Sequence, residues 1–188
     1  MGKLNRDVVV AEALDLLDEV GLDAVTTRRL AQRLGVEQPS LYWHFRGKAA
    51  LLSAMAGAAM RPHATAPLPE PGNDWRAWFL ENSRGFRRTL LARRDGARLH
   101  AGSLPDDADR ARIEHKLRFL VDAGVPHHTA QMGLLAASRF TVGSVLEEQD
   151  DDGSGAEALA SVGIDHDAAF DAGLELITAG MQTASASD

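Results

Sequence analysis

Apolar residues recur at helical spacing through almost all of this 188-residue chain. Residues 6–20 carry one such stripe, formed by Val9, Ala13, Leu16, Leu17 and Val20. Sustained period-two alternation is nearly absent and aromatic residues make up only 5%, so strands have little support. The chain is therefore predicted to be all-α.

Glycine, proline and threonine residues divide this helical pattern into segments. Gly21 and Gly35 are expected to end the first two helices, Thr26 or Thr27 to begin the second, and Pro39 to lie in the first turn of the third. The remaining helices are expected over residues 48–61, 74–91, 95–101, 105–123, 126–148 and 166–183.

A proline-rich stretch separates the short N-terminal helices from the longer ones that follow. Residues 61–72 contain four prolines, which disfavour regular structure. The predicted organisation is a helix-turn-helix head at 1–48, a connecting helix and linker at 49–72, and a ligand-binding and dimerisation body at 73–188. Residues 149–155, acidic and glycine-containing, are expected to form a mobile loop, and the polar tail 183–188 to lack order of its own.

Composition excludes several classes of protein. The 45% apolar and 25% charged fractions are those of a folded globular chain. The absence of cysteine excludes disulfide frameworks, zinc–thiolate sites and thiol nucleophiles. Charges interrupt the apolar stretches well before the length of a membrane span, and no export signal is visible. We expect a cytoplasmic protein with no membrane partner.

The charge distribution favours an anionic partner at the N-terminal end, although the net charge is −7. Residues 141–188 hold eleven acids and no lysine or arginine, whereas residues 1–140 hold 20 bases against 16 acids. Between residues 24 and 48 there are five bases and one acid, Glu37. Because salt screens charges beyond about 8–10 Å, this local excess matters more to a polyanion than the total.

Residues 26–48 have the outline of a helix-turn-helix, in which a small Ala31 lets the helices approach and Val36 fills the angle between them. Two helices packed only for their own stability would give the same outline. The predicted outer face favours DNA, because its side chains suit base edges (Arg28, Gln38, Ser40 and Tyr42) and phosphates (Thr27, Trp43, His44 and Lys48). At least one of the adjacent aromatics Tyr42 and Trp43 must face outward.

A single head of this kind makes few contacts, so selective binding predicts a homodimer on a palindrome. The last predicted helix carries a stripe that could serve as the interface, formed by Phe170, Gly173, Leu174, Ile177 and Met181. Gly173 and Gly180 each weaken a helix by about 1 kcal/mol, which a close helical neighbour would justify. The alternative is that this helix packs on its own core.

The run TTRRLAQRLGVEQPSLYWHFRGK, residues 26–48, closely resembles the TetR family of repressors. The likeness continues through residues 94–97, 99–100, 140–143, 145–148 and 173–177, and so covers nearly the whole chain. It implies base contacts by Arg28, Gln38, Pro39, Ser40 and Tyr42 and phosphate contacts by Thr27, Trp43, His44 and Lys48. It also implies a four-helix dimer bundle built from the helices near 126–148 and 166–183.

The same resemblance implies an effector held in the body as a drug–magnesium chelate. His100 would bind the metal and Ser103 and Glu147 its waters, while Asn82, Phe86 and Lys116 fall on positions that hold the drug. Since Mg²⁺ requires six contacts and keeps waters, such a set needs a ligand that itself chelates. Taken without the resemblance, a lone histidine such as His100 is more often a core histidine with its hydrogen bonds satisfied.

Three positions depart from the family pattern. The family's histidine is Ala64 here, its glutamine is Lys116, and the arginine beside the metal-site threonine is Leu104. The effector is therefore predicted to be tetracycline–Mg or another chelating or anionic compound.

No GxSxG, HExxH, Walker A or GxGxxG pattern occurs, so the sequence gives no support for an enzyme. The main hypothesis is a homodimeric repressor that binds operator DNA and is released by a small-molecule effector. The alternative is a metal-dependent or purely ligand-binding module whose DNA-binding head is not functional.

Overall fold

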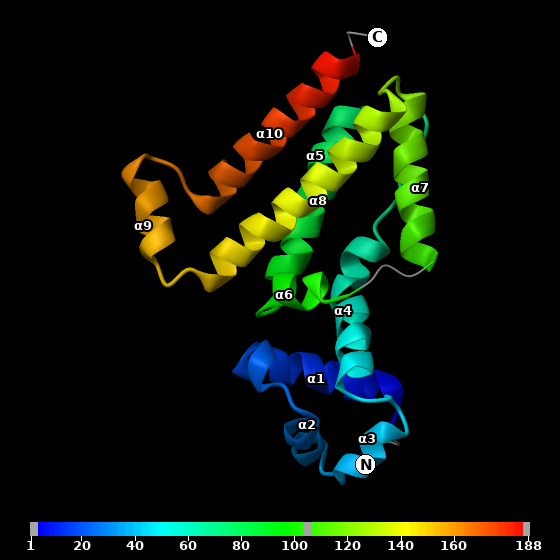
Figure 1. Cartoon of the computed structure of the whole chain (residues 1–188), viewed down its shortest axis with the longest axis vertical. Coiled ribbons are helices and arrows are strands. Elements are labelled where there is room, and N and C mark those ends of the chain that lie inside the picture. The colour runs from blue at the N-terminus through cyan, green and yellow to red at the C-terminus, as the bar shows by residue number, and fades with distance from the viewer. Residues whose placement is uncertain (1–3, 104–106, 186–188) are drawn as a thin grey trace. The chain divides into compact units, whose positions relative to one another are not determined.

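The computed structural model describes residues 4–103 and 107–185, and the regular structure within those ranges is entirely helical (Figure 1). The all-α prediction is confirmed. The helices are α1 (Arg6–Val20), the 3₁₀ turn η1 (Leu22–Ala24), α2 (Thr27–Leu34), α3 (Gln38–Tyr42), α4 (Lys48–Ala64), α5 (Trp75–Leu91), α6 (Gly96–Ala101), α7 (Asp107–Asp122), α8 (His127–Asp150), α9 (Ser154–Ser161) and α10 (His166–Ser185).

The described residues form two compact units. Unit 1 comprises those of Met1–His63 together with Thr89–Leu104, and unit 2 those of Ala64–Arg88 together with Pro105–Asp188. These units are defined by contacts within the folded chain. They do not correspond to the predicted head, linker and body, and that division remains a prediction.

Unit 1 is built around a core to which a distant segment contributes. Leu99 of α6 is buried with Val9 and Leu17 of α1 and Leu30 of α2. The same segment binds the acidic end of α1 and the turn after it: Arg93 pairs with Asp18, and Arg98 lies 3.0 Å from a carboxylate oxygen of Asp23. An acid at the end of α1 and one in η1 are thus paired with arginines of this segment.

Unit 2 is organised by α8 and α10, which lie side by side (Figure 1). A Cβ atom on Gly173 of α10 would strike the ring of Phe140 on α8, and one on Gly133 of α8 would strike Met181 on α10. Both glycines therefore allow a close helix approach within one chain.

This packing corrects the interpretation of the α10 stripe as a dimer surface. Phe170, Leu174 and Met181 are buried in the core of their own chain, and Ile177 packs against the same core. A stripe at helical spacing reports burial but does not tell which neighbour provides it.

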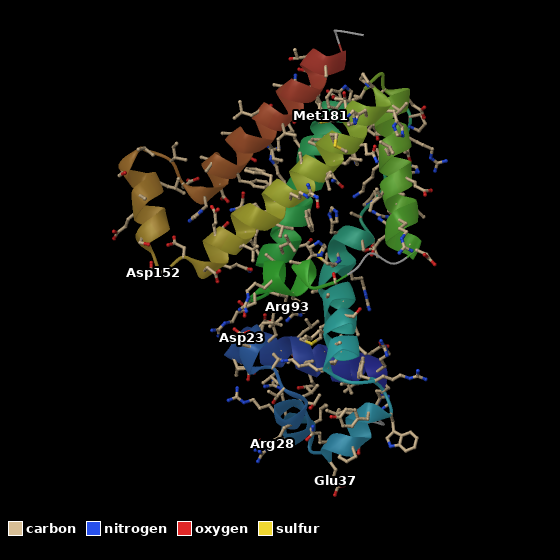
Figure 2. All side chains as sticks on the ribbon, viewed as in Figure 1. Asp23, Arg28, Glu37, Arg93, Asp152 and Met181 are labelled. Atoms are coloured by element: carbon tan, nitrogen blue, oxygen red, sulfur yellow. The ribbon has the colours of Figure 1, made fainter. Side chains whose placement is uncertain are left out.

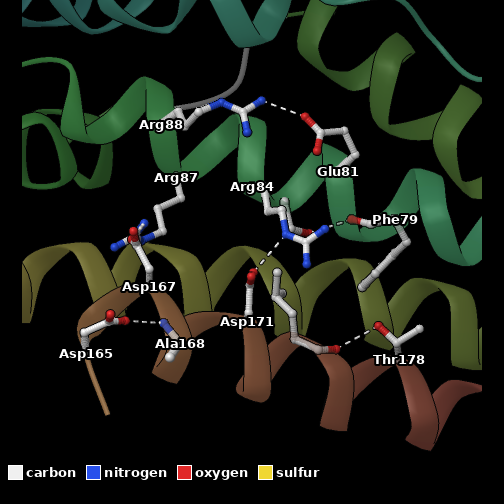
Figure 3. A network of polar contacts seen from close by, with 12 residues as sticks. Phe79, Glu81, Arg84, Arg87, Arg88, Asp165, Asp167, Ala168, Asp171 and Thr178 are labelled. Atoms are coloured by element: carbon white, nitrogen blue, oxygen red, sulfur yellow. Dashed lines mark hydrogen bonds and ion pairs between the residues drawn. The ribbon is translucent and has the colours of Figure 1, made fainter. Parts of the chain in front are cut away.

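A series of ion pairs joins α5 to α10 (Figure 3). Arg76 lies 3.5 Å from Glu175, Arg84 2.8 Å from Asp171, and Arg87 2.5 Å from Asp167. Arg87 also reaches Glu148 of α8 at 2.6 Å, and its guanidinium lies over the ring of Phe170, 5.1 Å from the centroid. One largely buried cation thus connects three helices.

Several predicted boundaries were wrong. α4 continues through Pro62 to Ala64, because a proline near the end of a helix removes only one backbone hydrogen bond and the last turn still closes. The sequence pattern predicts a third helix through about His44, but α3 begins at Gln38 and ends at Tyr42. The predicted start of the seventh helix at Pro105 lies outside the described residues.

The predicted loop 149–155 is much shorter in the structure, and α9 was missed altogether. The Asp151 carboxylate accepts hydrogen bonds from the backbone N–H groups of Gly153, Gly155 and Ala156, at 2.8–3.0 Å. These bonds hold the pKa of Asp151 below its usual value and satisfy amides at the start of α9. The polar tail was also predicted too long, since α10 extends to Ser185.

Candidate nucleic-acid interface and effector residues

The α2–α3 pair follows from local sequence chemistry. The Thr26 hydroxyl accepts a hydrogen bond from the Arg29 N–H at 3.2 Å and so begins α2. Gly35 ends α2 in the left-handed conformation, with φ 65°, which glycine adopts without steric cost. Leu30 and Ala31 of α2 are buried in the core of unit 1, so the opposite face of α2 is turned to solvent.

The outer face of this pair carries two exposed aromatic residues. Tyr42 is 51% exposed and Trp43, directly after α3, is 89% exposed. The expectation that at least one of them faces outward is confirmed for both. Both residues keep half or more of their surface in solvent, so both are available to a partner.

Gln38, at the start of α3, is held by its neighbours. Its amide nitrogen donates to the Thr27 hydroxyl at 2.8 Å and lies 3.3 Å from the Tyr42 hydroxyl. The side chain is half-buried and therefore does not have to be ordered again when a partner binds. Two of the predicted DNA-contacting residues thus position a third.

The basic charge of the segment is not all on the outer face. Arg33 binds Glu12 at 2.9 Å and Glu19 at 2.7 Å, both on α1, and these acids raise its pKa. Arg28 points away from the rest of the head (Figure 2). Within the described residues Arg28, Arg46 and Lys48 form no ion pair, so the outward charge is smaller than the sequence count suggests.

The remaining predicted contacts surround the same face. Pro39 is exposed, and Ser40 and His44 are half-buried. Lys48 is the exposed first residue of the 17-residue helix α4, where free backbone N–H groups favour an anion. Arg46 is an exposed cation to which the sequence analysis gave no role, although the count of bases already included it.

Four predicted effector residues lie in unit 2. Phe86 is buried and Asn82 half-buried on α5, Lys116 is half-buried on α7, and Glu147 is exposed near the end of α8. Burial, and then the charge of Arg112 one turn away, lower the pKa of Lys116 to about 8. The other two, His100 and Ser103, lie in unit 1, where the Ser103 hydroxyl donates to the His100 carbonyl at 2.7 Å. Leu104 lies outside the described residues.

The described residues contain no group of three histidine or acidic side chains able to hold a metal ion. Within the described ranges, a bare cation therefore finds no such group of side chains. A single histidine suits a metal that brings most of its ligands with it, which is the condition that a chelate satisfies.

A separate hollow of about 570 Å³ lies in unit 2 between the segment before α5 and the second half of α7. Trp75 and Phe119 line it, with His115 and Arg118 among its polar residues. None of Asn82, Phe86, Lys116 and Glu147 lines this hollow.

No helix within the described ranges combines the length and the apolar character that a membrane span requires.

The chain matches two family models that cover most of its length. Residues 9–55 match the model described as bacterial regulatory proteins, tetR family, and residues 68–162 match the tetracyclin repressor-like C-terminal domain. Together they define a bacterial regulator with a DNA-binding head and a sensor-type body.

Relatives and solved structures agree with this class. The tetracycline repressor protein class A from transposon 1721 of Escherichia coli is 45% identical over 96% of this chain and 92% of its own length. A TetR-family transcriptional regulator from Streptomyces coelicolor is 63% identical, with a TM-score of 0.77 and 97% of each chain covered. Class A TetR in complex with 5a,6-anhydrotetracycline and magnesium is 43% identical, with a TM-score of 0.79, covering 96% of this chain and 99% of that one.

The chain therefore belongs to the TetR family. It is a transcriptional repressor similar to the tetracycline repressors, and it is not an enzyme.

Proposed function

We propose that this protein is a homodimeric repressor that binds a palindromic operator through α2 and α3 and is released by a small-molecule effector. The observation that carries the proposal is the outward face of α2–α3, where Gln38 is fixed by Thr27 while Tyr42 and Trp43 stay exposed. Such a face is organised before any partner arrives.

Base reading is assigned to Arg28, Gln38, Pro39, Ser40 and Tyr42. Arg28 can bind guanine through two parallel hydrogen bonds, and Gln38 presents its carbonyl oxygen as an acceptor because its amide nitrogen is engaged. Thr27, Trp43, His44 and Lys48 are assigned to phosphates, which fix orientation but carry no sequence information. A repressor with these contacts acts on DNA in the cytoplasm.

Dimerisation is assigned to the outer faces of α8 and α10. Leu176 on α10 is 76% exposed, and Met132 and Leu135 on α8 are 41% and 40% exposed. These faces point away from the core that α8 and α10 share, and a second copy would cover them. Two copies can then occupy major grooves about 34 Å apart on a palindrome.

Effector contacts are assigned in each unit by itself: His100 and Ser103 in unit 1, and Asn82, Phe86, Lys116 and Glu147 in unit 2. The proposed ligands are tetracycline–Mg or another chelating or anionic compound, with His100 as the metal contact and Ser103 and Glu147 holding its waters. Asn82, Phe86 and Lys116 would hold the organic part, and a bound Mg²⁺ would neutralise the oxygens of the chelate. The solved complex of class A TetR with 5a,6-anhydrotetracycline and magnesium supports this ligand class.

A mobility-shift selection from a library of palindromic duplexes at physiological salt tests the DNA-binding role. We expect one palindrome to be enriched and the complex to contain two protein chains. Failure to prefer any palindrome would leave the alternative, a ligand-binding module with a non-functional head.

Leu176→Glu tests the dimer interface by sedimentation and operator binding. We expect a monomer with strongly reduced operator affinity, because a charge would be buried between the two copies. Ile113→Glu replaces a residue on α7 that is also exposed, and should leave a dimer. A dimeric Leu176→Glu protein would refute this interface.

Titration of the operator complex with tetracycline, with and without Mg²⁺, tests the effector class. Release that requires Mg²⁺ and is lost in His100→Ala supports the metal role. An unchanged response in His100→Ala removes that role.

A further inference from the structure

Arg6, the first residue of α1, lies against the α3–α4 turn, residues 43–47 of the same unit. Its Nη1 atom donates a hydrogen bond to the His44 carbonyl oxygen at 3.0 Å, across 38 residues of sequence. Its guanidinium carbon lies 4.4 Å from the centroid of the Phe45 ring, and Phe45 is only 4% exposed. A backbone carbonyl and a buried ring therefore hold the guanidinium in one place.

The positive charge of Arg6 has no acid partner within the described part of the chain. Arg33 and Arg98 of the same unit, by contrast, are paired with carboxylates. Asp7, the next residue, lies about 100° further round α1 and forms no ion pair with Arg6 in that part of the structure. Arg6 is exposed and its guanidinium has further N–H donors besides the one bound to the turn, so these can reach an anion.

The surroundings of this cation are also free of acids in sequence. Residues 38–48, which comprise α3, the turn and the start of α4, contain no aspartate or glutamate. Trp43, 89% exposed, and the exposed Lys48 lie on either side of the carbonyl that Arg6 binds, and both are proposed phosphate contacts. Because Arg6 is bonded to the turn itself, a phosphate that the turn holds would meet its charge.

We propose that Arg6 is a further phosphate-contacting residue, which extends the DNA-backbone contact from the α3–α4 turn to the start of α1. The inference rests on the proposed DNA-binding role of α2 and α3, and it adds a residue outside the helix-turn-helix. The planar guanidinium presents parallel N–H donors that match phosphate oxygens. Since its contacts to His44 and Phe45 already order it, little side-chain entropy is lost on binding.

The test measures duplex affinity over a range of salt concentrations. Each phosphate contact that is lost should lessen the slope of log K against log salt by about 0.9. Arg6→Met should show this decrease, because methionine keeps an unbranched chain beside Phe45 but carries no charge. Arg6→Gln is a second uncharged variant with the same expected result. Arg6→Lys keeps the charge and should keep the slope.

Arg118→Met is the matched control, because Arg118 is an exposed arginine of α7 that forms no ion pair among the described residues. Its slope should equal that of the unaltered protein. An unchanged slope in both uncharged Arg6 variants would overturn the proposal even if their affinity fell, because Arg6 would then only hold the turn. A slope lessened equally in Arg6→Lys would overturn it too, since the charge would not be the group that DNA contacts.

The slopes are measured on the selected palindrome and on a duplex of random sequence. Phosphate contacts are independent of sequence, so the random duplex tests Arg6 even if no palindrome is preferred. In that case the operator proposal fails, while a lessened slope in Arg6→Met still supports the phosphate contact. If the unaltered protein binds neither duplex at low salt, both proposals are wrong.

Discussion

The α2–α3 surface and the α5–α8–α10 core of unit 2 use polar side chains in opposite ways. In the core, Arg84 and Arg87 of α5 bind acids that lie 87 and 80 residues further along the chain, respectively. On the α2–α3 surface, Gln38 is held by Thr27 eleven residues away, while Arg28 and Lys48 have no ion pair in the described structure. Polar side chains paired with distant parts of the chain stabilise the fold. Polar side chains on the α2–α3 surface that lack such pairs can instead bind another molecule.

The largest expected effect comes from breaking the internal network. Arg87→Met removes the partner of Glu148 and Asp167 at a side chain only 10% exposed, and should lower the free energy of unfolding by about 3–5 kcal/mol. Urea denaturation at fixed protein concentration measures it.

Arg88→Met is the matched control for this change. Arg88 pairs with Glu81, and both side chains are more than 60% exposed, so the expected loss is about 0–1 kcal/mol. If both variants lose equal stability, the buried network has no special role.

A smaller effect is expected where α8 and α10 pack closely. Gly173→Ala forces a methyl group onto the Phe140 ring and should cost about 1–3 kcal/mol. Gly57→Ala, in α4 with nothing within 4 Å of its Cβ position, should instead stabilise the chain by up to about 1 kcal/mol. Thermal unfolding distinguishes them, and a neutral Gly173→Ala would contradict the close approach.

The smallest effect concerns the salt dependence of operator binding, to which Arg33 should not contribute. Arg33→Gln should leave the salt dependence of operator binding unchanged, because Arg33 is already bound to Glu12 and Glu19. Arg46→Gln removes an exposed arginine without an ion pair and should lessen the slope of log K against log salt by about 1. If the slope is lessened in Arg33→Gln by as much as in Arg46→Gln, Arg33 also contacts phosphate.

Short-range signals in the sequence predicted most of unit 1. Gly21, Thr26 and Gly35 set helix ends through their own backbone chemistry, and the resulting α1 and α2 lie where the pattern placed them. The outward position of Tyr42 and Trp43 followed from two neighbours on a helix of 3.6 residues per turn.

Two of the errors arose where a partner lies far away in sequence, and the third arose from a local contact. The α10 stripe was buried as expected, but Phe140, more than 30 residues earlier, is what covers Gly173. The number of basic residues in this segment did not reveal that Arg33 binds an acid of α1. Helix α9 depends on one carboxylate, Asp151, whose three backbone bonds have no periodic signature.

The central claim is that the outer face of α2–α3 reads bases while its surroundings hold the DNA backbone. Operator affinities of Arg28→Ala and Lys48→Ala, measured against every single-base variant of the selected palindrome, test it most directly. Arg28→Ala should lose about 1–3 kcal/mol and cease to discriminate at one symmetric position, whereas Lys48→Ala should weaken all duplexes alike. Uniform losses in both variants would contradict the claim.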